Sequence, residues 1–192
     1  LQIVNSDDAF ERYLKQAGLE MDMRTTQAER EKEERDTERK RAKRVTKARK
    51  GGYVEGRLGL IIDGTGKDYD KIAKQSIQLR QLGYDTHMIF VNTSLDVALE
   101  RNAKRERSVS NSVATNSWRA VQSNIGKFSQ HFRQNFVVVD NNDADIKDPQ
   151  IFNDVFKQIK GLLKKKVKSP IAKQWVMQQM KDRGIKKMPK GF

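Results

Sequence analysis

The sequence lacks cysteine and has only two histidines among its 192 residues. Without cysteine there is no disulfide, thiolate metal site or cysteine nucleophile, and two widely separated histidines argue against a histidine-based zinc site. No apolar run approaches the roughly 20 residues of a membrane-spanning helix, and no signal-peptide pattern opens the chain. We therefore expect a soluble, cytoplasmic protein.

Apolar residues are also scarce, at 36% of the chain against 33% charged residues. The 39 lysines and arginines outnumber the 25 acidic residues, which gives a formal net charge of +14. Such an excess favours a polyanionic partner, either a nucleotide, a nucleic acid or an anionic surface. The length fits one domain, or one domain with a short appendage.

Four short apolar runs predict β-strands, and amphipathic stretches typical of helices separate them. The strands are expected near 2–5, 58–63, 87–92 and 136–140. Strands that alternate with helices predict an α/β fold. We expect one parallel sheet in three layers, with helices on both faces.

Two segments are dominated by charge rather than by an apolar stripe. Residues 24–50 hold twelve basic and six acidic residues, which predicts a long polar helix of about 40 Å or a disordered arm ending at Gly51-Gly52. Residues 157–192 hold twelve basic residues and one acid. Ser169-Pro170 predicts the start of a further helix, which ends near Gly184. We divide the chain into a domain at 1–166 and a basic helical tail at 167–192.

Polar residues follow every expected strand. They are Asp7 and Asp8, Asp63 to Gly66, Asn92 to Ser94, and Asp140 to Asn142. Because ligands bind beyond the carboxyl ends of parallel strands, these residues are candidates for a ligand site. The alternative is that aspartate, asparagine and glycine are simply the usual residues of turns.

A basic passage follows the third expected strand. Arg101 and Arg105 lie four residues apart and share a helix face, with Lys104 and Arg107 beside them. Cations of this kind, together with a carboxylate that accepts a hydroxyl proton, are what phosphoryl transfer requires. The alternative is a solvated helix face.

These motifs, in this order, give the chain a family resemblance. The passages Ile3-Val-Asn-Ser-Asp7-Asp8, Ile61-Ile-Asp63-Gly-Thr65 and Leu99-Glu-Arg101-Asn-Ala-Lys104-Arg105 resemble the phage polynucleotide 5′-kinase and zeta-toxin branch of the P-loop kinases. The resemblance covers roughly residues 1 to 160. It implies a P-loop fold that binds ATP and Mg²⁺ and transfers the γ-phosphate to a hydroxyl.

The resemblance also implies roles for single residues. Asp7 would be the general base, and Arg105, with Arg101, would be a catalytic lid arginine. The nucleotide would be bound by four residues that follow expected strands, together with Lys104 of the basic passage. The four are Asp63, Thr65, Asp140 and Asn141. No metal ligand is assigned.

Two departures from the family pattern matter. Polynucleotide kinases carry arginine at the positions of Ser6 and Phe10, so the pattern favours kinase chemistry more than binding of a 5′-polynucleotide end. No G-x-x-x-x-G-K-[ST] phosphate loop occurs in the 192 residues. In the family this loop and the central strand precede the strand that here begins at Leu1. We expect both upstream of the given sequence.

Two functions therefore compete. The first is an ATP-dependent kinase whose acceptor is a nucleoside, a nucleic acid end, a nucleotide-sugar or a small metabolite. The second is a non-enzymatic phage-type structural or nucleic-acid-binding protein, found in the host cytoplasm or the virion. It would contact phosphates through residues 24–50 and the run Lys164, Lys165, Lys166 and Lys168. Solubilising charge is the alternative role for these basic segments.

Overall fold

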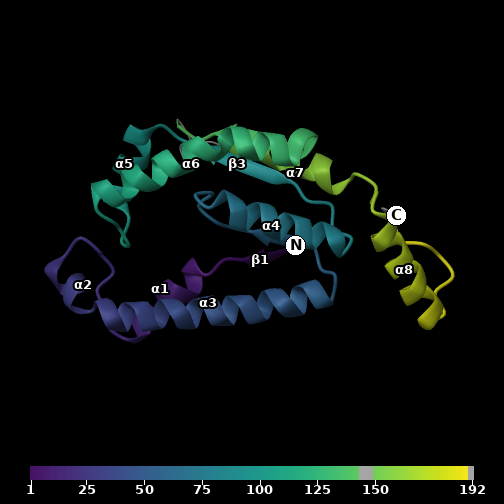
Figure 1. The fold of residues 1–192 in the computed structure, drawn as a ribbon, viewed down its shortest axis with the longest axis horizontal. Helices are drawn as coiled ribbons and strands as arrows, with labels where there is room; N and C mark the ends of the chain where they lie inside the picture. Colours follow the sequence, from purple (N-terminus) through teal and green to yellow (C-terminus); the bar gives the residue numbers. More distant parts are fainter. Residues whose placement is uncertain (143–148, 190–192) are drawn as a thin grey trace. The chain divides into compact units, whose positions relative to one another are not determined.

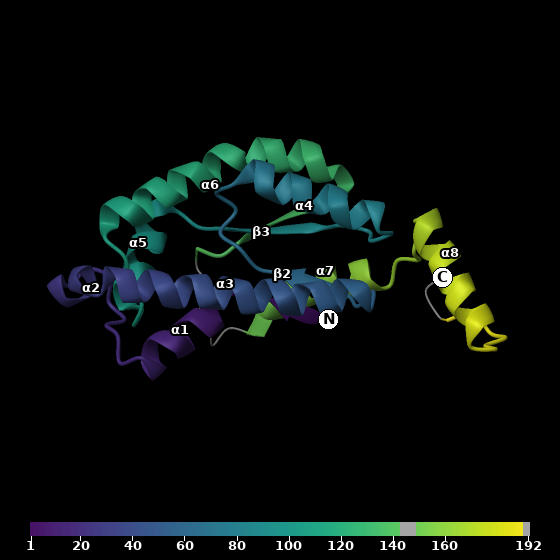
Figure 2. The same cartoon turned by 60° about the horizontal axis from the view of Figure 1, so that its bottom comes forward.

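The computed structural model describes residues 1–142 and 149–189, and the chain divides into two units (Figures 1 and 2). Unit 1 consists of Leu1–Thr65 and Leu95–Ala120. Unit 2 consists of Gly66–Ser94 and Val121–Phe192. Each unit combines helices with two short strands.

Helices and strands follow one another largely as the sequence predicts. In chain order the elements are β1 (Gln2–Val4), α1 (Asp7–Gln16), α2 (Thr26–Arg30), α3 (Lys32–Glu55), β2 (Leu60–Ile62), α4 (Tyr69–Gln81), β3 (Met88–Asn92), α5 (Leu95–Lys104), α6 (Asn111–Phe132), a 3₁₀ turn (Arg133–Asn135), β4 (Phe136–Asp140), α7 (Pro149–Leu163) and α8 (Pro170–Asp182). The boundary between the units falls within α6.

The strands form two parallel pairs rather than one sheet. Strand β1 pairs with β2, with Ile3 opposite Ile61, and β3 pairs with β4, with Phe90 opposite Val138. All four predicted strands are present and parallel, and among the described residues β2 and β3 are not paired with each other. The expected three-layer sheet is not seen. Each two-stranded sheet has too few neighbours to cover both faces, so Ile3 remains 65% exposed and Val138 remains 49% exposed.

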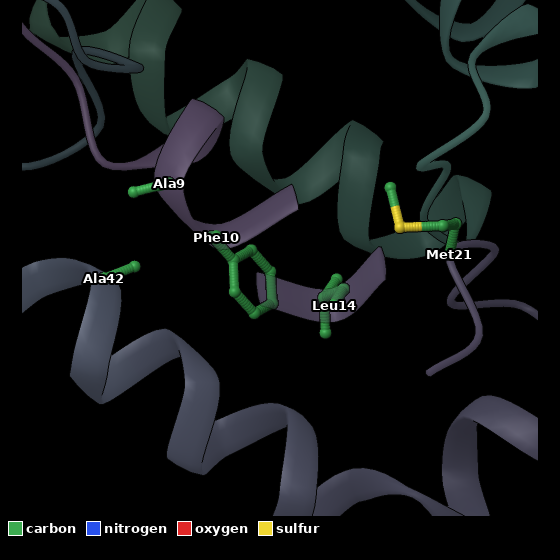
Figure 3. Packing of buried hydrophobic residues seen from close by; sticks show 5 residues of the cluster. All are labelled: Ala9, Phe10, Leu14, Met21 and Ala42. Atoms are coloured by element: carbon green, nitrogen blue, oxygen red, sulfur yellow. The ribbon is translucent and has the colours of Figure 1, made fainter. Parts of the chain in front are cut away.

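The core of unit 1 lies between α1 and α3. Phe10 and Leu14 recur four residues apart on α1, are 2% and 0% exposed, and lie on the side facing Ala42 of α3 (Figure 3). Met21 closes the cluster. The small side chain of Ala42 lets α1 and α3 approach each other closely. Ala42 is the member of this buried cluster that α3 contributes.

The long charged helix is confirmed, with different ends from those predicted. It is preceded by α2, whose N-terminus is capped by Thr25 through a 3.1 Å hydrogen bond from the Ala28 N–H to Oγ1. Helix α3 then continues through Gly51 and Gly52 to Glu55. Glycine costs a helix about 1 kcal/mol relative to alanine, which is too little to end a helix of this length.

The core of unit 2 is aromatic. Phe90 of β3 packs against Phe128 and Phe132 of α6, and all three are buried. Asn124 is also buried, because its Nδ2 donates to the carbonyl oxygens of Gly66 and Lys67 at 3.1 and 3.0 Å. These two bonds fix the loop after β2 against α6.

The C-terminal helix α8 begins and ends as predicted. Ser169 caps it by accepting a hydrogen bond from the Ala172 N–H, Pro170 is its first residue, and Gly184 follows it with a φ of +65°. Gly83 has a φ of +99°, and a Cβ there would come within 2.9 Å of the Ala172 nitrogen. Only glycine allows this close approach of α8 to the end of α4.

No helix in residues 1–142 and 149–189 combines the length and the apolar character needed to cross a membrane.

His131 provides a pH-sensitive contact between α6 and α4. Its Nε2 lies 3.0 Å from Arg80 Nη2 and also contacts Ser76 Oγ. Arginine only donates, so Nε2 must accept and the ring is neutral. Burial, and then the charge of Arg80, lower the pKa of His131. Burial followed by Lys165 lowers the pKa of His87 in the same way.

We predict that stability falls as the pH decreases through about 6.5, the pKa of an unfolded histidine. The unfolded chain then binds protons that the folded imidazoles resist, which favours unfolding. Urea midpoints measured between about pH 8 and pH 5.5 should show this loss, and His131→Gln and His87→Gln should each flatten the slope. An unchanged slope in both variants would contradict the prediction.

Candidate functional site

Asn5 joins the ends of β1 and β2. Its Nδ2 donates to Asp63 Oδ2 at 2.9 Å, and its Oδ1 accepts from the Asp7 N–H at 2.7 Å. The parallel register places Val4 opposite Ile62, so the residues after both strands emerge at the same edge. Two of the sequence-predicted residues, Asp7 and Asp63, are therefore held together through one amide side chain.

Asp7 lies in the first turn of α1 rather than in an extended segment. Ser6 is the N-cap residue, and Asp7 and Asp8 are the two acidic residues of the first turn. Acidic side chains at this position are stabilised by the positive end of the helix dipole. Both carboxylates are exposed, and the side chain of Asp7 is 52% exposed, which leaves it accessible to a ligand.

Arg107 is the cation that the structure brings to Asp7. Its Nη2 lies 3.4 Å from Asp7 Oδ1, and its Nε donates to Glu11 Oε1 at 2.9 Å. The Arg107 side chain is only 12% exposed. Asp7 and Glu11 lie four residues apart on α1 and therefore form one carboxylate face, which a single guanidinium spans.

Two arginines lie close to the ring of Phe10. The Cζ of Arg39 is 4.4 Å from the ring centroid, and that of Arg107 is 5.7 Å away. Both distances are within the range of cation–π attraction. Phe10 thus links the carboxylate face of α1 to the basic helix α3.

The predicted lid residues lie in the same unit. Arg101 and Lys104 are in the last turn of α5. Arg105 follows this helix, its side chain is exposed, and its backbone N–H donates to the Asn102 carbonyl oxygen at 3.3 Å. Lys104 forms an exposed ion pair with Glu100 at 2.5 Å. Asn102 braces the loop by bonding both backbone groups of Val109 at 2.7 and 3.1 Å.

The remaining predicted nucleotide-binding residues are in two places. Thr65 is exposed in the loop after β2, at the end of a segment of unit 1. Asp140 and Asn141 follow β4 in unit 2, where Asp140 Oδ1 accepts from the Asn142 N–H and Nδ2 at 2.9 and 2.7 Å. The Asn141 N–H in turn donates to the Asn92 carbonyl at 2.8 Å. These bonds tie the ends of β3 and β4 together.

The predicted nucleic-acid-binding lysines follow α7. All four side chains are exposed, and they are Lys164, Lys165, Lys166 and Lys168. The N–H of Lys168 lies 3.3 Å from Asp85 Oδ2. The run therefore presents cationic side chains to solvent.

Within the described ranges, no three aspartate, glutamate or histidine side chains converge as a metal would require. Mg²⁺ commonly takes only one or two protein carboxylates, with phosphates and water as its other ligands. Asp63, oriented by Asn5, is a suitable single ligand of this kind.

Sequence reasoning assigned no role to Asn5 or Glu11 and gave Arg107 only a place beside Arg101 and Arg105. The four-residue spacing of Asp7 and Glu11 was the one local signal for a shared carboxylate face, because residues i and i+4 lie on the same side of a helix. Their partner lies 96 residues from Glu11 along the chain. No local pattern could have connected them.

Comparison with known proteins identifies the family. The family model described as zeta toxin matches residues 20–155, and the chain belongs to this family. The match implies a P-loop kinase-like fold, ATP-dependent kinase-like activity and a nucleotide substrate. Searches of curated proteins and of solved structures gave no match. Asp7 precedes the matched segment, whereas Asp63, Arg101 and Arg105 lie within it.

We predict that Arg107 and Glu11 are strongly coupled in stability. A double-mutant cycle with Arg107→Met and Glu11→Gln should give a coupling of about 1–2 kcal/mol, since the guanidinium is largely buried and holds two carboxylates. The matched control is the exposed pair Lys104 and Glu100, with Lys104→Met and Glu100→Gln, which should couple less. Chemical denaturation measures both cycles. Equal coupling would contradict the proposed importance of Arg107.

Proposed function

We propose that the protein is an ATP-dependent phosphotransferase that transfers the γ-phosphate of ATP to a hydroxyl group, with Asp7 as the general base. The observation that carries the proposal is the arrangement of Asn5, Asp7 and Asp63 at the ends of two parallel strands. Membership in the zeta toxin family supports the reaction type.

Asp7 suits the role of base because its carboxylate is accessible and its position is fixed. The bond from its own N–H to Asn5 holds the backbone, while Arg107 approaches one carboxylate oxygen at 3.4 Å. A base held in this way can accept the proton of an acceptor hydroxyl as that oxygen attacks the phosphorus. Arg107 then limits the rotation of the carboxylate.

ATP and Mg²⁺ are the expected donor and cofactor. When bound, Mg²⁺ neutralises charge on the β- and γ-phosphates. Asp63 would contribute a carboxylate to the ion, and Thr65 and Lys104 lie in the same unit as further polar contacts. Arg105 and Arg101 would act from the loop and the last turn of α5, where guanidinium groups stabilise charge on the transferring phosphate. Asp140 and Asn141 would contact the nucleoside.

Position 10 bears on the acceptor. The family's polynucleotide kinases place an arginine there, whereas here Phe10 is buried and two arginines from other parts of the chain lie against its ring. Arg39 and Arg107 therefore place guanidinium groups close to α1, although residue 10 of α1 is not itself an arginine. A 5′-hydroxyl nucleic acid end stays among the candidate acceptors, together with nucleosides, nucleotide-sugars and small metabolites.

We predict that Asp7→Asn lowers phosphate transfer by roughly 10²–10⁴-fold, because the amide keeps the size of the side chain but cannot accept the proton. ATP affinity should stay nearly unchanged, since the base contacts the acceptor. The assay uses the full-length protein with radiolabelled ATP and a panel of the acceptors named above.

Asp8→Asn is the matched control, because Asp8 is the adjacent acidic residue in the same first turn. Its turnover should stay close to that of the wild type. Full turnover in Asp7→Asn, or a larger loss in Asp8→Asn, would show that Asp7 is not the base.

A second candidate function is nucleic-acid binding through the four exposed lysines that follow α7. Their exposure is the observation that favours it. We predict that binding to duplex DNA weakens steeply with salt, with a log–log slope near −0.9 for each phosphate neutralised. Replacing Lys164 and Lys165 by glutamine should reduce the slope by about two such units. Absence of binding at low salt would remove nucleic acid as a partner.

A further inference from the structure

Arg35 is a cationic side chain that is buried in unit 1. It lies in the first part of α3 and is 4% exposed. Both terminal nitrogens, Nη1 and Nη2, are buried and lack a hydrogen-bond partner among the described residues. Buried charges are normally paired and hydrogen-bonded, because removing them from water is costly. A guanidinium in this state is therefore suited to bind an anionic group.

The acidic residues near Arg35 are engaged elsewhere. Glu31, one turn earlier, accepts hydrogen bonds from the Glu20 N–H and the Gln27 side chain. Glu38, one turn later, pairs with Arg41 at 3.3 Å. Neither carboxylate therefore satisfies the guanidinium.

A pocket of about 150 Å³ lies beside Arg35, between α1, α2 and the start of α3. Its apolar wall includes Phe10, Met23 and Ala28. Its charged wall is formed by Arg35 and Arg39 with Lys32, Glu29 and Asp36. Glu29 is held by Lys32 at 3.5 Å. Asp36 lines the pocket beside Arg35 without an ion pair among the described residues that reaches the Arg35 terminal nitrogens.

The electrostatics of the pocket favour an anion. Burial lowers the pKa of Arg35. The charges of Arg39 and Arg107 act in the same direction, and the carboxylates of Glu31 and Glu20 oppose them. Arginine nevertheless stays protonated in proteins. Arg39 and Arg107 lie against the Phe10 ring, and Arg35 lines the same pocket as Phe10 and Arg39. Of these three, Arg107 is the one that forms ion pairs with carboxylates within the described part of the chain.

We propose that this pocket, the Arg35 pocket, is an oxyanion-binding site that takes the phosphate or carboxylate group of a small ligand on the Arg35 guanidinium. The planar fork of arginine matches the two oxygens of either group. The apolar wall at Phe10 and Met23 would contact the body of the ligand. Phe10 lies one turn after Asp7, but the site stands whether or not the protein is a kinase.

The test uses inorganic phosphate and sodium acetate as separate probes on the purified protein, with ionic strength held constant by NaCl. Thermal unfolding and isothermal titration calorimetry measure binding. At least one probe should raise the unfolding temperature in a saturable way, and the probe that binds more tightly identifies the group. Binding in Arg35→Met should weaken by at least about tenfold, because a charge-assisted hydrogen bond is lost. Without ligand this variant should be at least as stable as the wild type, since the buried charge is gone.

Arg44→Met is the matched control, because Arg44 is an exposed arginine on the same helix and its loss changes the net charge equally. It should bind as the wild type does. If Arg35→Met fails to fold, the NMR signal of the Arg35 Nε in the wild-type protein, assigned with Arg35→Lys, should shift on titration. The proposal is overturned if neither probe raises the unfolding temperature more than NaCl does at the same ionic strength. It is also overturned if Arg44→Met loses as much binding as Arg35→Met, or if the Arg35 Nε signal does not shift.

Discussion

The buried ring of Phe10 is the contact on which unit 1 depends. It joins α1 to α3 through the apolar cluster, and the guanidinium groups of Arg39 and Arg107 both lie close to its ring. Arg107 in turn holds Asp7 and Glu11. The ring therefore helps the basic helix α3 to lie beside the acidic first turn of α1. It attracts both guanidinium groups, and Asp7 and Glu11 neutralise the charge of Arg107.

A chain with few apolar residues and a high positive charge depends on polar contacts as well as on apolar packing. Unit 1 buries only a small cluster, so polar contacts such as the Asn5 bridge and the bonds from Asn102 to Val109 fix its loops. Unit 2 relies on aromatic packing and on Asn124, which satisfies the loop carbonyls after β2. Arg35 is the exception, because its two terminal nitrogens are buried without a hydrogen-bond partner among the described residues.

The functional interpretation rests on two independent observations. The zeta toxin family match covers residues 20–155 and implies kinase-like chemistry. The candidate base Asp7 lies outside that segment, and its place is supported by its bond to Asn5 and its pairing with Arg107. An active phosphotransferase needs both a donor site and an accessible base, and the two observations address these parts separately.

The sequence alone determined which segments become strands and helices, because apolar periodicity and caps such as Ser169 act over a few residues. It also indicated Asp7 and Asp63 as strand-end carboxylates and suggested the family. Tertiary structure decided that the four strands form two separate pairs with exposed faces, and that Arg107 lies against Asp7. It also decided that Arg35 is buried among charged neighbours. Arg107 lies 96 positions from Glu11 and still further along the chain from Asp7. Only packing in three dimensions selects this arginine among many similar ones.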